Sequence, residues 1–322
     1  LGYAEAAGTR DELAAHLAEI VEKARSDEAR AALQRALARL LAASEEERAE
    51  AIPAYRRLLE IVPGDPEALD ALARLYREQG AWGELLEVLR RQLLAAPSPE
   101  SRAELLRRIG ELQDERLGDP AAAIATLRRL LEFAPDDTAA LERLDRLCLR
   151  AERWAELADT LAREIELARG AGRREAELAL MFRLAQVREE RLLDRAGALA
   201  LYREILAARP GHEETLARLE AIVAREPGLE EAAEILAAAL RAVNDHGRLA
   251  RLLEERANAT GDARARKPLL LELARVRSQH LGRPDLAFLT LARAFREEPA
   301  DAEVRRLLER AAEQAELHEE LA

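Results

Sequence analysis

The feature that most constrains the fold of this chain is that similar sequence segments recur at intervals of 72 residues. The phrase WGELLEVLRRQL at 82–93 returns as WAELADTLAREI at 154–165, and AIPAYRRLLEIVPGDPEAL at 51–69 returns as AIATLRRLLEFAPDDTAAL at 123–141. A further copy, ALALYREILAARPGHEETL, occupies 198–216, which is 75 residues beyond the second copy. A fixed period of this length is typical of architectures in which similar structural units stack and share one continuous core.

Each unit of the repeat reads as two amphipathic helices joined by a short break. In 66–97 apolar residues recur at spacings of three and four, as on one face of a helix. Asp65 is the expected N-cap, and Pro66 fits the first helical turn. Gly80 is expected to end the first helix, and Pro97 to stop the second. Because the connection between them is short, the two helices should be antiparallel.

The composition supports an all-α fold. Ala, Leu, Glu and Arg dominate, and all four favour helix, whereas no window alternates polar and apolar residues as a half-buried strand would. Hydrophobic residues make up 49% of the 322 residues, which is enough for a large core. Only 3% are aromatic, so Ala and Leu must fill that core. We therefore predict an all-α solenoid of stacked antiparallel helix pairs.

Charge and hydropathy exclude two classes of partner. The net charge of −12 argues against nucleic acid, because phosphate backbones require a basic surface. The sequence has no run of 18 apolar residues, so we expect no membrane insertion. Its first residues lack the basic and apolar stretches of a signal peptide. Cys148 is the only cysteine, which suits a reducing compartment, and a cytoplasmic location is expected.

No motif in the sequence carries catalytic or metal chemistry. The patterns HExxH, CxxC, GxxxxGK[ST] and GxGxxG are all absent. Each histidine falls on a different predicted helix or turn; the five are His16, His212, His246, His280 and His318. Cys148 occupies a core position of its repeat and is expected to be a buried small side chain. We therefore predict a protein that is not an enzyme and binds no metal or cofactor.

One stretch breaks the period. His246 takes the position of Trp154 in its repeat but lies 92 residues after it, where 72 would be expected. The surplus is about one helix, and we predict an inserted helix at 213–229, between regular helix pairs at 1–212 and resumed pairs at 230–322. Both ends of the chain fall inside repeats. The sequence is therefore expected to be one solenoid over 1–322 that is a fragment of a longer array.

The helix pairs resemble the tetratricopeptide repeat, in a degenerate form of the bacterial type. In 66–97 the family pattern is matched by Leu69, Leu72, Ala73, Tyr76, Leu85, Leu89 and Pro97. In 106–135 it is matched by Leu106, Ile109, Gly110, Ala123, Leu127, Leu130 and Pro135. The resemblance covers nearly the whole chain. It implies a right-handed superhelix that binds other proteins.

The resemblance also implies a binding surface. In the family the first helices of successive repeats line a concave groove that holds a partner segment. The positions that map to this groove are Arg74, Arg77, Arg107, Arg108, Arg143, Arg146, Arg150, Phe182 and Arg183. Their basic character predicts an acidic partner segment bound through arginine–carboxylate pairs. Two alternatives stay open: the arginines are ordinary surface charges offset by nearby Glu, and Phe182 belongs to the core.

Three functions are consistent with this sequence. The first is a non-enzymatic scaffold that binds a protein or peptide in the groove. The second is a regulatory or sensor segment of a larger multidomain enzyme. The third is a structural element that self-associates through open solenoid ends. The family's clamp for a C-terminal carboxylate uses Asn and Lys, and neither residue type occurs at the mapped groove positions, so that ligand is not expected.

Overall fold

The computed structural model describes residues 10–43 and 48–315, and every regular element in these ranges is a helix. The chain divides into two compact units, residues 1–160 and 161–322. The first unit holds α2 (Arg10–Lys23), α3 (Asp27–Ala42), α4 (Arg48–Ile61), α5 (Pro66–Gln79), α6 (Trp82–Ala95), α7 (Pro99–Glu115), α8 (Pro120–Phe133) and α9 (Thr138–Arg150). Helix α10 (Trp154–Gly170) begins in the first unit and ends in the second.

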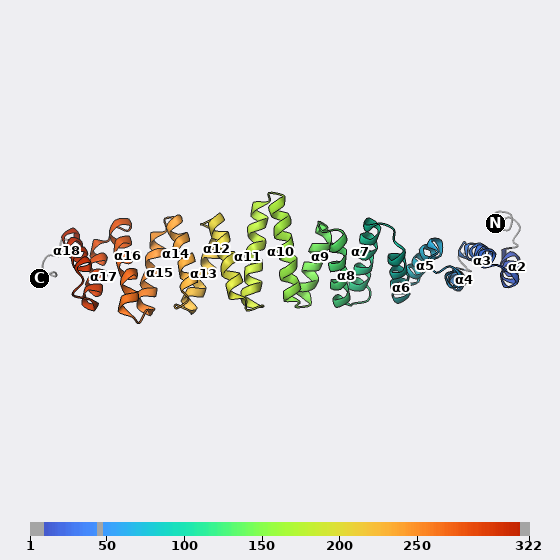
Figure 1. Cartoon of the computed structure of the whole chain (residues 1–322), viewed down its shortest axis with the longest axis horizontal. Coiled ribbons are helices and arrows are strands. Elements are labelled where there is room, and N and C mark those ends of the chain that lie inside the picture. Colours follow the sequence, from blue (N-terminus) through green and yellow to red (C-terminus); the bar gives the residue numbers. More distant parts are fainter. Residues whose placement is uncertain (1–9, 44–47, 316–322) are drawn as a thin grey trace. The chain divides into compact units, whose positions relative to one another are not determined.

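The second unit continues the same pattern of short helices. It holds α11 (Arg174–Glu190), α12 (Arg195–Ala208), α13 (Glu213–Arg225), α14 (Glu230–Ala242), α15 (His246–Ala259), α16 (Ala263–Arg275), the π-helix η1 (Val276–His280), α17 (Pro284–Glu297) and α18 (Ala302–Ala315). Figure 1 shows that, within each unit, helices that follow one another in sequence lie side by side and run in opposite directions. The predicted all-α solenoid of antiparallel helix pairs is confirmed.

Helix ends fall where the sequence places them. The carboxylate of Asp65 accepts a hydrogen bond of 2.9 Å from the backbone N–H of Ala68, which makes it the N-cap of α5. Gly80 closes that helix in left-handed geometry, with φ of 69°. Trp82 is the first residue of α6, and His246 opens α15 in the same way.

Aliphatic side chains fill the core, as the low aromatic content requires. In the first unit one continuous cluster runs from α3 through α7 and includes Leu58, Leu72 and Leu89, each at most 1% exposed. Cys148 is also fully buried, as predicted. Because each helix contacts helices one or two places away in sequence, the core of each unit extends along its stack of helices.

Ion pairs connect many of the helices to the next helix but one. The paired residues are 28 to 36 positions apart, as in Arg39–Glu67 of α3 and α5 and Arg150–Asp114 of α9 and α7. The same spacing joins α12 to α14 through Arg203 and Glu231 in the second unit. We call these contacts the inter-helix ion pairs. They use many of the charged residues that the sequence carries.

The predicted insertion at 213–229 corresponds to α13 and the turn that follows it. That this helix is the inserted element stays a prediction. The partial helices expected at the two ends of the chain lie outside the described residues.

Candidate partner-binding grooves

Seven of the nine predicted site residues lie on three helices of the first unit. Arg74 and Arg77 belong to α5, and Arg107 and Arg108 to α7. The residues on α9 are Arg143, Arg146 and Arg150. The other two, Phe182 and Arg183, lie on α11 in the second unit. The seven arginines divide into a paired and an unpaired set.

Arg107 is held in place by the start of α9. Its Nη2 donates a hydrogen bond of 2.6 Å to Oδ2 of Asp137, whose Oδ1 accepts from the backbone N–H of Ala140 at 3.0 Å. Burial raises the pKa of the Asp137 carboxyl, but the hydrogen bonds from Arg107 and the backbone outweigh this and leave the pKa below its ordinary value. Arg107 is therefore a structural residue that reinforces a helix cap.

Two arginines of α9 are paired with carboxylates of α7. Arg143 Nη2 donates to Oε1 of Glu115 at 2.6 Å, and its Nη1 lies 3.5 Å from Oε1 of Glu111. Arg150 donates to Asp114. Arg143 and Arg150 are therefore neutralised by acidic residues of the chain itself, as in the first alternative. Their partners lie on α7 and not on their own helix.

The other four arginines form no ion pair with a described residue of the chain. In the described part of the chain no carboxylate lies within ion-pair distance of Arg74, Arg77, Arg108 or Arg146. Arg74 and Arg146 hold equivalent positions 72 residues apart, and both are exposed. An exposed guanidinium with no partner is free to bind a carboxylate from another molecule.

Phe182 packs inside its own unit. Its ring lies 6.0 Å from that of Tyr202 and 5.8 Å from that of His212, and its side chain is half-buried. His212 caps α13 as Asp137 caps α9, so Phe182 takes the place of Arg107 and an aromatic contact replaces the ion pair. Packing accounts for this side chain, and contact with a partner stays a prediction. Arg183, the next residue, is half-buried as well.

A block of three helices recurs along the chain. The text RLGDP at 116–120 joins α7 to α8, and its counterparts RLLDR at 191–195 and HLGRP at 280–284 join α11 to α12 and η1 to α17. We name the three copies the α7 block (α7–α8–α9), the α11 block (α11–α12–α13) and the α16 block (α16–α17–α18). The surface between the first and third helix of each block can therefore be compared position by position.

In the α11 block this surface is a groove of about 680 Å³ lined by ion pairs. Glu189 accepts two hydrogen bonds of 2.9 Å from Arg218 and a third of 2.9 Å from the Tyr202 hydroxyl. Arg195 forms a second two-pronged pair with Glu226 at 2.7 and 2.8 Å. This groove thus satisfies most of its own charges, as does the α7 block.

In the α16 block the same surface is an open groove of about 670 Å³ with an apolar floor. Leu271 and Leu307 occupy the positions of Arg107 and Arg143, so the ion pairs of the α7 block cannot form here. Arg310 takes the position of Arg146. The groove positions predicted from the sequence end at α11 and do not include this site, although its signal is present in the HLGRP motif at 280–284.

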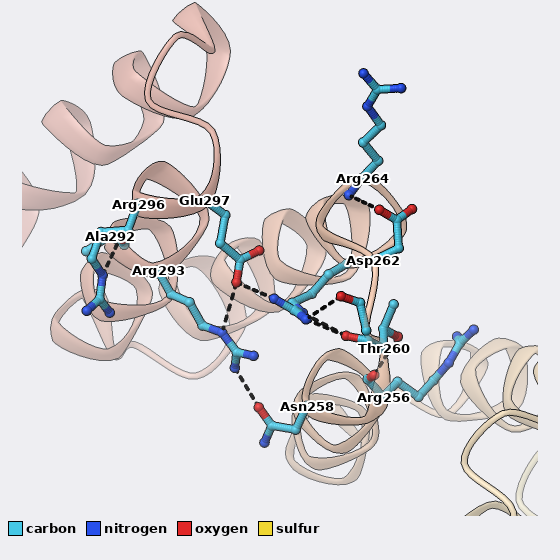
Figure 2. A network of polar contacts seen from close by, with 11 residues as sticks. Arg256, Asn258, Thr260, Asp262, Arg264, Ala292, Arg293, Arg296 and Glu297 are labelled. Atoms are coloured by element: carbon cyan, nitrogen blue, oxygen red, sulfur yellow. Dashed lines mark hydrogen bonds and ion pairs between the residues drawn. The ribbon is translucent and has the colours of Figure 1, made fainter.

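Polar contacts on the far side of α16 fix the geometry of this block. Figure 2 shows Arg293 between Asn258 and Glu297, with Asp262 capping α16 nearby. Arg266 adds hydrogen bonds to the carbonyl of Thr260 and to Glu297. These contacts join the end of α15 and the start of α16 to α17.

Two further properties bear on function. In the part of the chain that the structure describes, no three His, Cys, Asp or Glu side chains are grouped as metal ligands. Among the same residues, no helix is both long and apolar enough to cross a membrane.

The sequence and structure are similar to known repeat proteins. Two sequence models of the tetratricopeptide repeat match residues 68–103 and 104–137. No curated protein matches the sequence.

Solved structures provide a second comparison. YrrB, a tetratricopeptide-repeat protein with an unusual peptide-binding site, is 18% identical over 63% of this chain and 97% of its own, with a TM-score of 0.33. The Naa15/Naa10 complex bound to HypK-THB contains a chain that is 16% identical, with 97% of this chain and 54% of that one covered and a TM-score of 0.40. A tetratricopeptide-repeat protein from Parabacteroides merdae is 14% identical over 94% of this chain and 99% of its own, with a TM-score of 0.29.

Proposed function

Because the chain belongs to the tetratricopeptide-repeat family, whose members generally mediate protein–protein interactions, we propose that it is a non-catalytic scaffold for an acidic partner segment. The segment lies along the surface of α5, α7 and α9 in the first unit. Carboxylates of the partner contact the unpaired arginines of this surface. The predicted residues Phe182 and Arg183 are the corresponding positions of α11 in the second unit.

The observation that supports this proposal is the selective pairing of the arginines. Arg107, Arg143 and Arg150 are engaged by carboxylates of the chain, whereas Arg74 and Arg146 are not paired with any carboxylate among the described residues. The paired arginines join α7 to α9, and the two unpaired arginines recur at a 72-residue interval. A repeated, unneutralised positive charge in a chain of net charge −12 favours an acidic ligand at that position.

The test is a charge reversal at the two equivalent positions. Arg74→Glu combined with Arg146→Glu should weaken binding of a fluorescein-labelled Glu/Ala peptide by about tenfold or more, because two charge-assisted contacts become repulsive. The matched control is Arg57→Glu with Arg129→Glu, an exposed pair on α4 and α8 with the same 72-residue spacing. Equal losses in both variants, or binding that does not weaken with added salt, would refute the proposal.

A further inference from the structure

We propose that the groove of the α16 block is a second partner-binding site, which opens on the opposite layer of its unit from the groove of the α11 block. Its occupant is a partner segment that carries an apolar side chain beside carboxylates. This inference goes beyond the arginine surface of the first unit and does not depend on it. It rests on the stacking of the helices, on the chemistry of the groove and on a comparison with the other face.

The inter-helix ion pairs divide the second unit into two layers. One layer contains α11, α13, α15 and α17. Arg218 of α13 binds Glu189 of α11, and Arg248 of α15 binds Glu220 of α13 at 2.7 Å. Arg293 of α17 donates to Asn258 of α15.

The other layer contains α12, α14, α16 and α18. Arg203 of α12 binds Glu231 of α14, and Arg241 of α14 binds Glu272 of α16 at 2.8 Å. Lys267 of α16 contacts Asp301, the N-cap residue of α18. Successive helices of the unit therefore belong alternately to the two layers.

Equivalent helices of the two blocks lie in different layers. The α11 block places its first and third helices, α11 and α13, in the first layer. The α16 block places the corresponding helices, α16 and α18, in the second. The reason is the connection between the blocks: two helices, α14 and α15, separate these blocks, whereas α10 alone separates the α7 and α11 blocks. With α13 aligned to α9, the additional helix falls between α13 and α16, next to the 213–229 segment predicted from the sequence. One additional helix exchanges the layers, so the two grooves face opposite sides of the unit.

The groove of the α16 block has the chemistry of a binding site for an apolar and acidic segment. Its floor consists of small and aliphatic side chains, among them Leu291 and Ala311. Arg275 and Arg310 border it, both exposed, and no carboxylate of the described chain lies within ion-pair distance of either. Glu303 is the one lining carboxylate without an ion pair among the described residues, so unpaired positive charge exceeds negative.

The π-helix η1 shapes one wall of this groove. Ser278 and Gln279 of η1 line the cavity, and the Ser278 hydroxyl donates to the side-chain carbonyl of Gln314 on α18 at 3.1 Å. The corresponding turn of α7, which carries Asp114 and Glu115, is α-helical and acidic. Short π-helical turns are frequent at functional sites, because the wider turn redirects side chains. Here it presents neutral hydrogen-bonding groups where the α7 block has carboxylates.

The other face of the same helices lacks these properties. Between α15 and α17 the cavity is only about 220 Å³. Its two arginines are both engaged: Arg277 binds Glu254 at 2.7 Å and the Thr290 hydroxyl at 2.7 Å, and Arg293 is held as shown in Figure 2. Open volume and unpaired arginines thus occur together on one layer only, within the described part of this block.

Three fluorescein-labelled 12-residue peptides of matched length test the ligand class: one of Leu with Asp and Glu, one of Leu with Lys, and one of Ser with Asp and Glu. Fluorescence anisotropy should show binding of the first peptide at least about tenfold tighter than of the other two. Arg275→Glu with Arg310→Glu should reduce this affinity by about tenfold or more. The control, Arg251→Glu with Arg264→Glu, makes the same charge change at exposed positions outside the groove and should have no effect.

Two additional measurements keep the inference separate from the proposed function. Gln279→Trp should block the groove without a change of charge, and Arg74→Glu with Arg146→Glu should leave binding at this site unchanged. A benzoylphenylalanine placed at the Leu position of the peptide should cross-link to α16, η1 or α18. In a chain that also carries Arg74→Glu with Arg146→Glu, so that the first unit does not contribute, binding that survives Arg275→Glu with Arg310→Glu, or cross-links to the α15–α17 face, would overturn the inference. Loss of binding in the Arg74 and Arg146 variant would instead assign the peptide to the first unit.

Discussion

The pairing of Arg107 with Asp137 leads to a stability prediction that can be worked out from two caps of different construction. Asp137 caps α9 and also binds Arg107, whereas Asp119 caps α8 through the N–H of Ala122 at 2.9 Å and has no arginine partner among the described residues. Replacing Asp119 with Ala should therefore cost only the cap, about 1 kcal/mol. Replacing Asp137 with Ala removes the cap and a charge-assisted hydrogen bond as well.

The additional loss at Asp137 can be given a magnitude. Hydrogen bonds to charged groups contribute about 1.5–3 kcal/mol. The side chain of Asp137 is 11% exposed, but that of Arg107 is 36% exposed and keeps Glu104 nearby, so solvent screening places the contribution at the low end. Asp137→Ala should therefore destabilise the chain by about 2–2.5 kcal/mol, and Asp119→Ala by about 1 kcal/mol.

The measurement is urea unfolding followed by far-UV circular dichroism, with amide hydrogen exchange of α9 as a local readout, because stacked repeats can open one at a time. Adding Arg107→Ala completes a double-mutant cycle, in which the coupling should be about 1 kcal/mol. Lowering the pH gives an independent check. Since the pKa of Asp137 is lower in the folded chain than its ordinary value, its stabilisation is present above the ordinary value and is lost as the pH falls through the folded pKa. Equal losses from the two caps and zero coupling would refute the reasoning.

Two further predictions concern single residues. Leu193 has φ of +56° and is 82% exposed, where the equivalent residues Gly118 and Gly282 adopt the same geometry without strain, so Leu193→Gly should stabilise the chain by about 1 kcal/mol in urea unfolding. A lower midpoint would mean that the leucine contributes contacts that outweigh its strain. Cys148 is fully buried, and burial raises its pKa to about 11, so near neutral pH a thiol reagent should label it about a hundredfold faster in denaturant than in buffer. Fast labelling of the folded chain would show that α9 opens readily.

The helices could be predicted from the sequence because their signals are local. Asp65 and Gly80 act through contacts within a few residues, so an N-cap or a left-handed C-cap glycine can be recognised in a short stretch of sequence. Trp82 and Trp154 mark helix starts because the same short text recurs around them. The repeat period then supplied the stacking, since similar units can share a core only by packing in series.

The division of the arginines could not be predicted in this way. Whether Arg107 binds Asp137 depends on how α7 and α9 are aligned across the stack, and the two residues are 30 positions apart. The same holds for Phe182, whose role depends on a histidine cap 30 positions later. The groove of the α16 block could have been found by aligning the HLGRP sequence with RLGDP. Its openness follows from the loss of the ion pairs that Arg107 and Arg143 form in the α7 block, because Leu271 and Leu307 take their positions, and this is seen only once the helices are assembled.

The inter-helix ion pairs have a consequence for how far a disturbance spreads along the array. In a stack with contacts only between near neighbours, the length that opens as one event is set by the coupling at each junction. Here part of that coupling is Coulombic and exposed to solvent, as at Arg203–Glu231, where both side chains are about half exposed. Concentrated salt weakens such exposed contacts, because the screening length falls to about 3 Å at 1 M, but it leaves the aliphatic core intact. Ionic strength therefore sets how many helices unfold together. Dilute buffer favours cooperative unfolding of many helices, and concentrated salt favours unfolding in small segments.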